Sequence, residues 1–212
     1  MPINVIFHDT RLEGRTPVST SSTRSFEVDG DTPTSEFFEH VISLSNENNG
    51  IGTLYIMAHG VRVLDLHTSA IKFTHDFISY QNVHLFQQLR EKVERIVLFV
   101  CHASETDLTT HGDGDELCRQ MARNAQAEVT AARENQAYLS VESCGLFSCE
   151  EAAIDFGEWE GPVVVYDRNG VIIAQYNNPS SWRDTEGVMH DPRVDPNPYR
   201  DGEGSHHTSM GR

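Results

Sequence analysis

The sequence has no apolar run long enough to span a membrane, and its amino terminus lacks the basic and then apolar layout of a signal peptide. Basic residues are scarce, since 16 Lys and Arg stand against 32 Asp and Glu and the formal net charge is -16. This charge excludes nucleic acid and anionic membrane as expected partners, because both bind through phosphates to basic surfaces. We therefore expect a cytoplasmic protein that acts on a protein or peptide substrate, with a basic partner favoured by charge.

Cysteine is also rare, and the four that occur are irregularly spaced, at Cys101, Cys118, Cys144 and Cys149. This number and spacing exclude a disulfide framework in a cytoplasmic chain and match no zinc site. Cys118 falls on the apolar face of a predicted helix and is interpreted as a packing residue, while Cys144 and Cys149 receive no functional interpretation. The acidic loop at 111–116 lacks the ligand spacing of an EF-hand, so we expect no metal and no cofactor.

The length of 212 residues suits one α/β domain with a sizeable core, and no internal repeat is visible. From residue 178 onward Pro, Asp, Gly, Ser and His dominate and apolar residues are sparse. Such a composition is typical of an extended or disordered segment. We therefore expect one domain over residues 1–177 and a polar tail over 178–212, with a propeptide or an inhibitory flap as the roles considered for the tail.

Apolar runs, amphipathic periods and turn residues predict alternating strands and helices. Strands are expected at 3–7, 53–58, 96–100, 128–132 and 138–141, and hairpins across 61–74 and 161–176, the second turning at Asn169-Gly170. Helices are expected at 33–47 with Thr32 as the cap, at 83–93, and at 114–125 with a capping box of Asp113 and Glu116. Residues 11–31 show no sustained period and are expected to form a loop or a loose hairpin.

Two of the predicted strands end in residues that can carry chemistry. The strand at 53–58 is followed by His59 and Gly60, and the strand at 96–100 is followed by Cys101. A helical segment between them makes the unit strand, helix, parallel strand, so both strands finish at one edge of the sheet. Open α/β sheets place their sites at that edge, where neighbouring strands lie about 4.8 Å apart. The sequence therefore predicts that His59 and Cys101 face each other across a cleft.

These residue types match the needs of a cysteine peptidase, which are a thiolate, an imidazole and backbone N–H groups for an oxyanion. Cys101 would be the nucleophile, His59 would manage protons, and the N–H groups of Gly60 and Cys101 would hold the oxyanion. Taken singly, a Cys that closes an apolar strand is more often a core residue, and a His-Gly pair is a common turn. The order of strand, His-Gly, hairpin, helix, strand and Cys is the feature that favours the catalytic interpretation.

The segments 54–60 and 96–104, followed by a helix at 114–125 and a strand at 127–132, resemble the caspase-like cysteine peptidases. This family includes caspases, metacaspases, separases, clostripain-like enzymes and bacterial CHAT-type domains. The resemblance implies an α/β fold, a three-layer sandwich with a mostly parallel central sheet. It implies His59 and Cys101 as a catalytic dyad, Gly60 as the oxyanion residue, and hydrolysis of a peptide bond after a specific side chain without a metal.

The sequence departs from this family next to the cysteine. Many relatives have a small residue directly before it and several have a polar or acidic pocket residue two positions before it, whereas this chain has Val100 and Phe99. Relatives also line the first specificity pocket from the end of the first strand, which here offers Asp9 and Arg11. Asp9 would favour a Lys or Arg side chain and Arg11 an acidic one; the acidity of the chain favours the basic choice, and a turn-capping role is the alternative for Asp9.

The sequence thus predicts a cysteine endopeptidase that cleaves a specific protein, with a preference for a basic residue before the scissile bond. Its chief alternative is a catalytically inactive caspase-like interaction module of a toxin or defence system, which the loss of the small residue at Val100 favours. A thiol hydrolase of non-peptide esters or amides is a third candidate. A regulatory protein is a further candidate partner.

Overall fold

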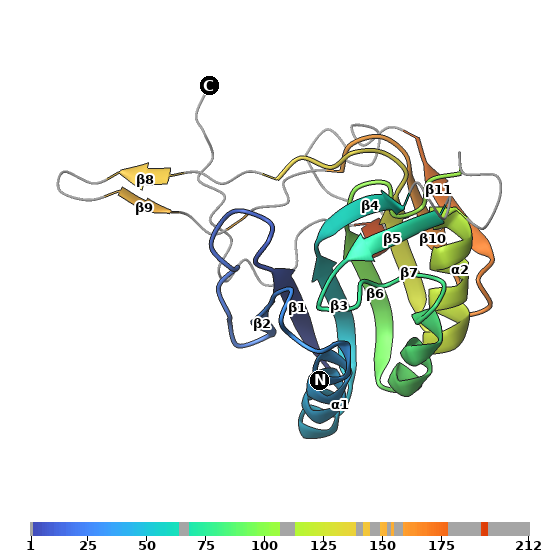
Figure 1. The fold of residues 1–212 in the computed structure, drawn as a ribbon. Helices are drawn as coiled ribbons and strands as arrows, with labels where there is room; N and C mark the ends of the chain where they lie inside the picture. The colour runs from blue at the N-terminus through green and yellow to red at the C-terminus, as the bar shows by residue number, and fades with distance from the viewer. Residues whose placement is uncertain are drawn as a thin grey trace.

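A seven-stranded sheet forms the centre of the structure. The structure is a computed structural model, and it describes residues 2–63, 68–106, 113–138, 142–144, 149–151, 154, 159–177 and 192–194. In spatial order the strands are β11 (Ile172–Tyr176), β10 (Val163–Tyr166), β7 (Glu128–Ala132), β6 (Val93–Phe99), β3 (Ile51–Met57), β1 (Ile3–Asp9) and β2 (Thr23–Val28). Strands β2, β1, β3, β6, β7 and β11 run in one direction, and within this sheet β10 runs the other way (Figure 1). The predicted α/β sandwich with a mostly parallel central sheet is confirmed.

Helices cover one face of this sheet. They are α1 (Thr34–Glu47), the 3₁₀ helix η2 (Val83–Leu89) and α2 (Gly114–Ala125), and their apolar side chains share one core with alternate residues of the strands. From β2 the chain moves across the sheet in one direction, past β1 to β3 and then through β6 to β7. Crossovers of the usual right hand along such a path leave their helices on the same face.

The opposite face of the sheet has its own apolar core. Tyr55, Met57, Val97 and Phe99 project from the strands and pack with residues from outside the sheet, namely Leu12, Ile154, Trp159 and Val194. The indole N–H of Trp159 donates to the Val194 carbonyl oxygen at 2.9 Å, so a segment near the carboxyl terminus lies against this face. That segment, η4 (Pro192–Val194), falls inside the predicted tail, whose parts 178–191 and 195–212 lie outside the described residues.

Several predicted elements need correction. Residues 23–28 form an edge strand parallel to β1, although a loop or loose hairpin was predicted, because an edge strand has one neighbour and tolerates exposed polar side chains. Helix α1 starts after Pro33, since the Thr32 hydroxyl bonds to Asp29 at 2.8 Å and does not cap the helix. The segment predicted as a helix over 83–93 ends at Leu89, because Glu91 adopts a positive φ of 61° and Val93 begins β6.

The predicted Asp113 cap of α2 and the predicted hairpin at 161–176 are confirmed. Asp113 caps α2 by accepting from the Glu116 N–H at 3.1 Å, whereas the Glu116 carboxylate bonds to Gln120 and Arg123 and does not close the expected capping box. Strands β10 and β11 form the antiparallel hairpin, with Gly170 at φ 72° in its turn. Tyr138 lies outside any strand, and the remainder of the predicted strand 138–141 falls among residues that are not described.

Two small hairpins complete the fold. Strands β4 (His59–Val63) and β5 (Thr68–Lys72) pair antiparallel beside the main sheet, which confirms the hairpin expected after Gly60 and starts it at His59 (Figure 1). Strands β8 (Glu142–Cys144) and β9 (Cys149–Glu151) pair in the same way and were not predicted as strands.

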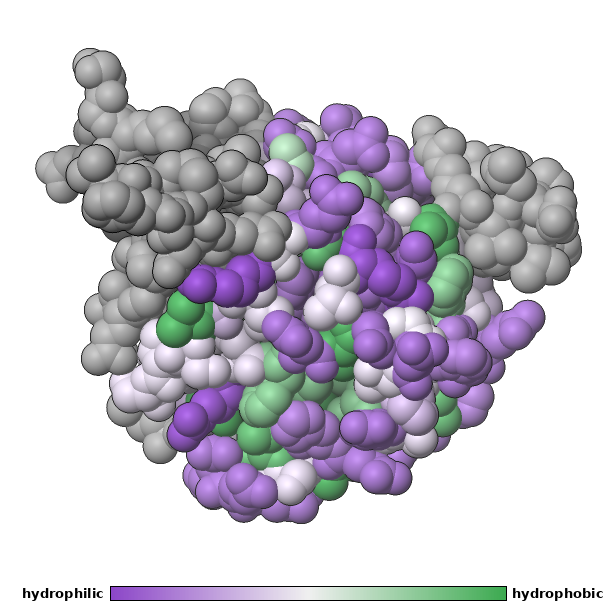
Figure 2. Space-filling model, turned by 60° about the vertical axis from the view of Figure 1, so that its left-hand side comes forward, coloured by the Kyte–Doolittle hydropathy of each residue, from purple (hydrophilic) through white to green (hydrophobic). Residues whose placement is uncertain are grey.

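The surface on the β2 side of the molecule, which Figure 2 brings forward, is mostly hydrophilic with hydrophobic residues between the polar ones. On β2 itself Arg24 and Glu27 are exposed. Charged side chains on an edge strand hinder pairing with a second chain. Within the described ranges, no helix combines the length and the apolar character that a membrane span requires.

Candidate active site

The strand ends that carry the predicted dyad are neighbours. Strands β3 and β6 are parallel and hydrogen-bonded, with Met57 opposite Phe99 in the register. Both of these residues belong to the core on the face opposite α1, η2 and α2. His59 and Cys101 each follow two positions later, so they leave the sheet at the same edge, in register and with the same parity. The predicted juxtaposition of the two strand ends at one sheet edge is confirmed.

Gly60 brings the two strand ends into direct contact. A Cβ atom built on Gly60 would lie 1.7 Å from the carbonyl oxygen of Cys101 and 3.2 Å from a methyl group of Val100. No side chain fits there, so the close approach of the backbone requires glycine. The turn after β3 therefore packs on the backbone of the predicted nucleophile.

A cavity of about 320 Å³ lies beside this contact. The β4–β5 hairpin, the turn after β6 and the start of α2 enclose it. Its lining residues are Gly60, Val61, Ser69, Ala70, Ile71, Cys101, His102, Ala103 and Leu117. The Cys101 residue is partly exposed, which leaves it accessible from this space.

The turn that holds Cys101 is anchored on the loop after β7. His102 adopts a positive φ of 53°, its N–H donates to the Glu134 carbonyl at 2.9 Å, and its ring bonds to the Arg133 carbonyl at 3.2 Å. The ring thus points toward that loop, although the residue also lines the cavity. The N–H of Gln136 donates to the Cys101 Sγ atom at 3.2 Å, and the thiol lies 3.5 Å from the Gln136 carbonyl oxygen.

The side chain of Gln136 fixes this loop in place. Its amide nitrogen donates to the Glu160 carbonyl at 2.7 Å and to the Asn135 carbonyl at 2.8 Å, and its oxygen accepts from the Glu160 N–H at 3.0 Å. Gln136 is buried. Sequence reasoning missed this residue, because it touches the sulfur through its backbone and backbone contacts leave no side-chain motif.

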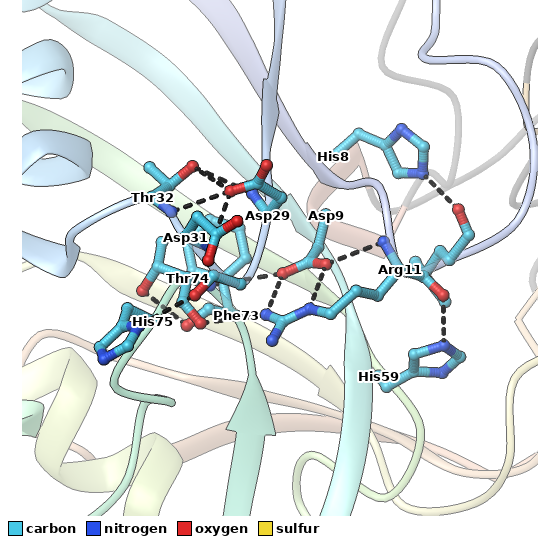
Figure 3. A network of polar contacts seen from close by, with 12 residues as sticks. His8, Asp9, Arg11, Asp29, Asp31, Thr32, His59, Phe73, Thr74 and His75 are labelled. Atoms are coloured by element: carbon cyan, nitrogen blue, oxygen red, sulfur yellow. Dashed lines mark hydrogen bonds and ion pairs between the residues drawn. The ribbon is translucent and has the colours of Figure 1, made fainter.

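His59 is held by a backbone oxygen from the first strand's loop. Its Nε2–H donates to the Arg11 carbonyl at 3.0 Å (Figure 3). Because a carbonyl can only accept, this bond places the proton of the neutral ring on Nε2 and leaves Nδ1 as a proton acceptor. Arg11 was considered only for its side chain, so this orienting role of its carbonyl was not predicted.

Asp9 and Arg11 form an ion pair that shapes the same loop. The Arg11 Nε and Nη2 atoms donate to the two Asp9 carboxylate oxygens at 2.8 and 2.5 Å, and the Arg11 and Thr74 N–H groups donate to them as well (Figure 3). The hydrogen bond that Arg11 donates to the Asp9 carboxylate raises the pKa of Arg11. Asp9 is fully buried and is absent from the described residues that line the cavity. Since Arg11 and Thr74 already satisfy this carboxylate, it offers no free charge to a basic substrate.

His8, which precedes this pair, anchors the loop from inside the protein. Its Nε2–H donates to the Leu12 carbonyl at 3.2 Å and its Nδ1 lies 2.8 Å from the Thr16 hydroxyl. Burial lowers the pKa of His8, against the opposing effects of the Leu12 carbonyl and of the carboxylates of Glu27 and Asp9. His8 thus ties Leu12 and Thr16, which follow Arg11 in the chain, to the end of β1.

We expect stability to depend on the protonation of His8. The unfolded chain titrates at its ordinary pKa of 6.5, while the pKa in the folded protein is lower. Below about pH 6.5 the unfolded state therefore binds more protons, and the free energy of unfolding falls by up to about 1.4 kcal/mol per pH unit from this group. In the His8→Gln variant, the free energy of unfolding should therefore fall less steeply with decreasing pH than in the wild type, by up to about 1.4 kcal/mol per pH unit. Urea unfolding of both proteins between about pH 7.5 and pH 5 measures this difference. An unchanged slope, matching that of the exposed-site control His84→Gln, would contradict this expectation.

Cys118 is a packing residue, as the sequence predicted. It is fully buried on α2, its thiol lies 3.1 Å from the Ala103 carbonyl oxygen, and burial raises its pKa well above the usual value. A neutral buried thiol reacts slowly, because the thiolate is the nucleophile. We expect iodoacetamide to modify Cys101 in the native protein at least about tenfold faster than Cys118 at pH 8, with both reacting in urea. Peptide mapping by mass spectrometry would measure the two rates, and equal native rates would contradict the assignment.

Comparisons with family models, with curated proteins and with solved structures find no match for this chain. In the part of the chain that the structure describes, no group of three or more His, Cys, Asp or Glu side chains is arranged to hold a metal ion. The chemistry of this site is therefore inferred from its own residues.

Proposed function

We propose that this protein is a cysteine endopeptidase with Cys101 as its nucleophile and His59 as its proton carrier. The observation that carries the proposal is the contact of Gly60 with the Cys101 backbone, at the shared edge of two adjacent parallel strands and beside a cavity. The substrate class is a peptide segment of a protein. The caspase-like resemblance of the sequence agrees with this assignment and is independent of the contact.

The proposed reaction has two steps. The His59 Nδ1 atom takes the thiol proton of Cys101, the sulfur attacks the scissile carbonyl carbon, the C–N bond breaks, and His59 gives that proton to the departing amine. A thioester of Cys101 with the acyl half of the substrate remains. Water then attacks the thioester carbon, His59 accepts a proton from that water, and the C–S bond breaks to release a carboxylic acid and restore the thiol.

Two contacts and one pair of backbone N–H groups suit this chemistry. The bond from His59 to the Arg11 carbonyl sets the tautomer whose Nδ1 can accept a proton. The N–H of Gln136 donates to the Cys101 sulfur at 3.2 Å and holds the sulfur in a fixed position. The backbone N–H groups of Gly60 and Cys101 are the proposed donors to the oxyanion, whose charge needs preorganised dipoles.

A second candidate function is a catalytically inactive interaction module. It is favoured by the sulfur of Cys101, which the backbone of Gln136 contacts through both its N–H and its carbonyl oxygen. In such a module these contacts would be structural, and Val100, where a smaller residue was expected, would be tolerated because no substrate enters. The two candidates differ in whether Cys101 reacts with a peptide.

The test is labelling with a peptidyl acyloxymethyl ketone mixture, which alkylates a cysteine only after its peptide part binds. The wild-type protein, Cys101→Ala, His59→Ala and Cys118→Ala are incubated with the probe and mapped by mass spectrometry. The peptidase proposal predicts one adduct at Cys101, none in Cys101→Ala, slower labelling in His59→Ala, and unchanged labelling in Cys118→Ala. No labelling of the folded wild type would favour the inactive module. So would labelling of Cys101 that is no faster than its alkylation by iodoacetamide, when each rate is divided by the rate of the same reagent with a free thiol.

A further inference from the structure

The cavity beside Cys101 is lined by small and apolar side chains. Ala70, Ile71, Ala103 and Leu117 are each buried and belong to its wall, and Val61 lies at a partly exposed position. Among the described residues that line it there is no Asp, Glu, Lys or Arg. His102 and Cys101 are the titratable groups of this wall, and the His102 ring is directed to the Arg133 carbonyl and lies 3.8 Å from the Glu105 carboxylate.

The size of the cavity suits one side chain. Sites for small molecules occupy about 300 to 1,000 Å³, and the 320 Å³ found here stands at the lower end of that range. An uncharged side chain gains by leaving water for such a wall, whereas a charged one loses hydration and finds no Asp, Glu, Lys or Arg among the described lining residues. The wall therefore selects against charge.

We propose that this cavity is the subsite for a small apolar side chain next to the scissile bond, of the size of Ala to Leu. The inference rests on the proposed peptidase function and names its substrate class. The occupant follows from continuity, because Gly60 and Cys101, which would hold the reacting carbonyl, also line the cavity. A substrate side chain adjacent to that carbonyl enters the cavity. Asp9, which is buried and ion-paired with Arg11, is not among the described residues that line the cavity.

The experiment is a positional-scanning peptide library cleaved by the full chain, with products identified by mass spectrometry and kcat/KM measured for single peptides. At one of the two positions flanking the cleaved bond, we expect Ala, Val or Leu to exceed Asp, Glu, Lys and Arg by at least about tenfold in kcat/KM. Charged residues preferred at both positions would overturn the inference and leave the peptidase proposal standing. If the protein neither cleaves any peptide of the library nor forms an adduct with the ketone probe, the peptidase proposal itself is refuted, and the inference with it.

Variants of the cavity wall make the assignment specific. Ala70→Leu fills the space and should lower kcat/KM for a Leu peptide by at least about tenfold while sparing the Ala peptide, whereas Val61→Ala should favour the Leu peptide. Val61→Asp places a carboxylate in the wall and should raise the preference for Lys or Arg over Leu by at least about tenfold. If Ala70→Leu does not fold, the Val61 variants decide.

The matched control is Val171→Asp. Val171 is exposed in the β10–β11 turn, and because β10 runs antiparallel to β7 this turn lies at the sheet edge opposite Cys101. The control makes the same change of side chain and net charge away from the cavity, so its cleavage profile should equal that of the wild type. A profile that shifts equally in Val171→Asp and Val61→Asp, or that shifts in neither, would overturn the inference.

Discussion

Replacing Cys101 with alanine is expected to lower kcat for peptide cleavage by at least about a thousandfold, because the proposed reaction has no other nucleophile. Replacing His59 with alanine is expected to lower kcat by about a hundredfold or more, since the departing amine then lacks a positioned proton donor. Both residues are partly exposed at strand ends, so the variants should unfold at nearly the wild-type temperature. Steady-state kinetics and thermal unfolding of each purified variant provide the measurement.

The matched control for the histidine is His84→Ala. His84 is exposed on η2, on the helical face of the sheet, and should be replaceable without loss of kcat. A fully active His59→Ala variant, or equal losses in both histidine variants, would contradict the role of His59. Retained cleavage in Cys101→Ala would contradict the proposed nucleophile.

Replacing Gly60 with alanine is expected to have the largest effect on folding and to disrupt the site at the same time. The added methyl carbon would lie 1.7 Å from the Cys101 carbonyl oxygen, so two backbone segments have to separate. Forcing atoms into a packed site costs about 1 to 3 kcal/mol, and a clash with backbone places the cost at or above about 3 kcal/mol. Urea unfolding would measure the loss of stability, and kinetics at a temperature where the variant is folded would measure the loss of activity.

Gly30→Ala is the control for this substitution. A Cβ on Gly30 would come no closer than 3.2 Å to any atom outside its chain neighbours, and that atom, Nη1 of Arg11, belongs to a side chain and not to the backbone. We expect its stability to lie within about 1 kcal/mol of the wild type. A Gly60→Ala variant as stable and as active as Gly30→Ala would show that the contact between Gly60 and Cys101 is not essential to the site.

The sequence predicted the part of the site that strand patterns encode. The runs before His59 and Cys101 are apolar on both parities, so they indicated two buried parallel strands, and the sheet register then aligned their ends. The contacts of Gln136 with the sulfur and of Arg11 with the imidazole were not predictable in this way. Both are made by backbone atoms of loops, whose positions depend on tertiary packing and not on a local period.

The errors in the fold have physical reasons of the same kind. Residues 23–28 are polar enough to look like a loop, yet β1 supplies a full set of hydrogen-bonding partners along one side. The helical period of 83–89 is real, but the positive φ of Glu91 ends the helix and frees Val93 for the next strand. Asp9 was considered for the specificity pocket because it follows the predicted first strand. In the structure its carboxylate forms an ion pair with Arg11, two residues later.

The most direct test of the central claim is to trap the acyl-enzyme. A peptide thioester carrying an apolar residue at its acyl end is mixed with the full-length protein, quenched in acid after milliseconds to seconds, and digested for mass spectrometry. The account predicts the acyl group on the peptide that contains Cys101, formed more slowly in His59→Ala and not formed in Cys101→Ala. Turnover without any acyl group on Cys101, or an acyl group on another residue, would contradict it.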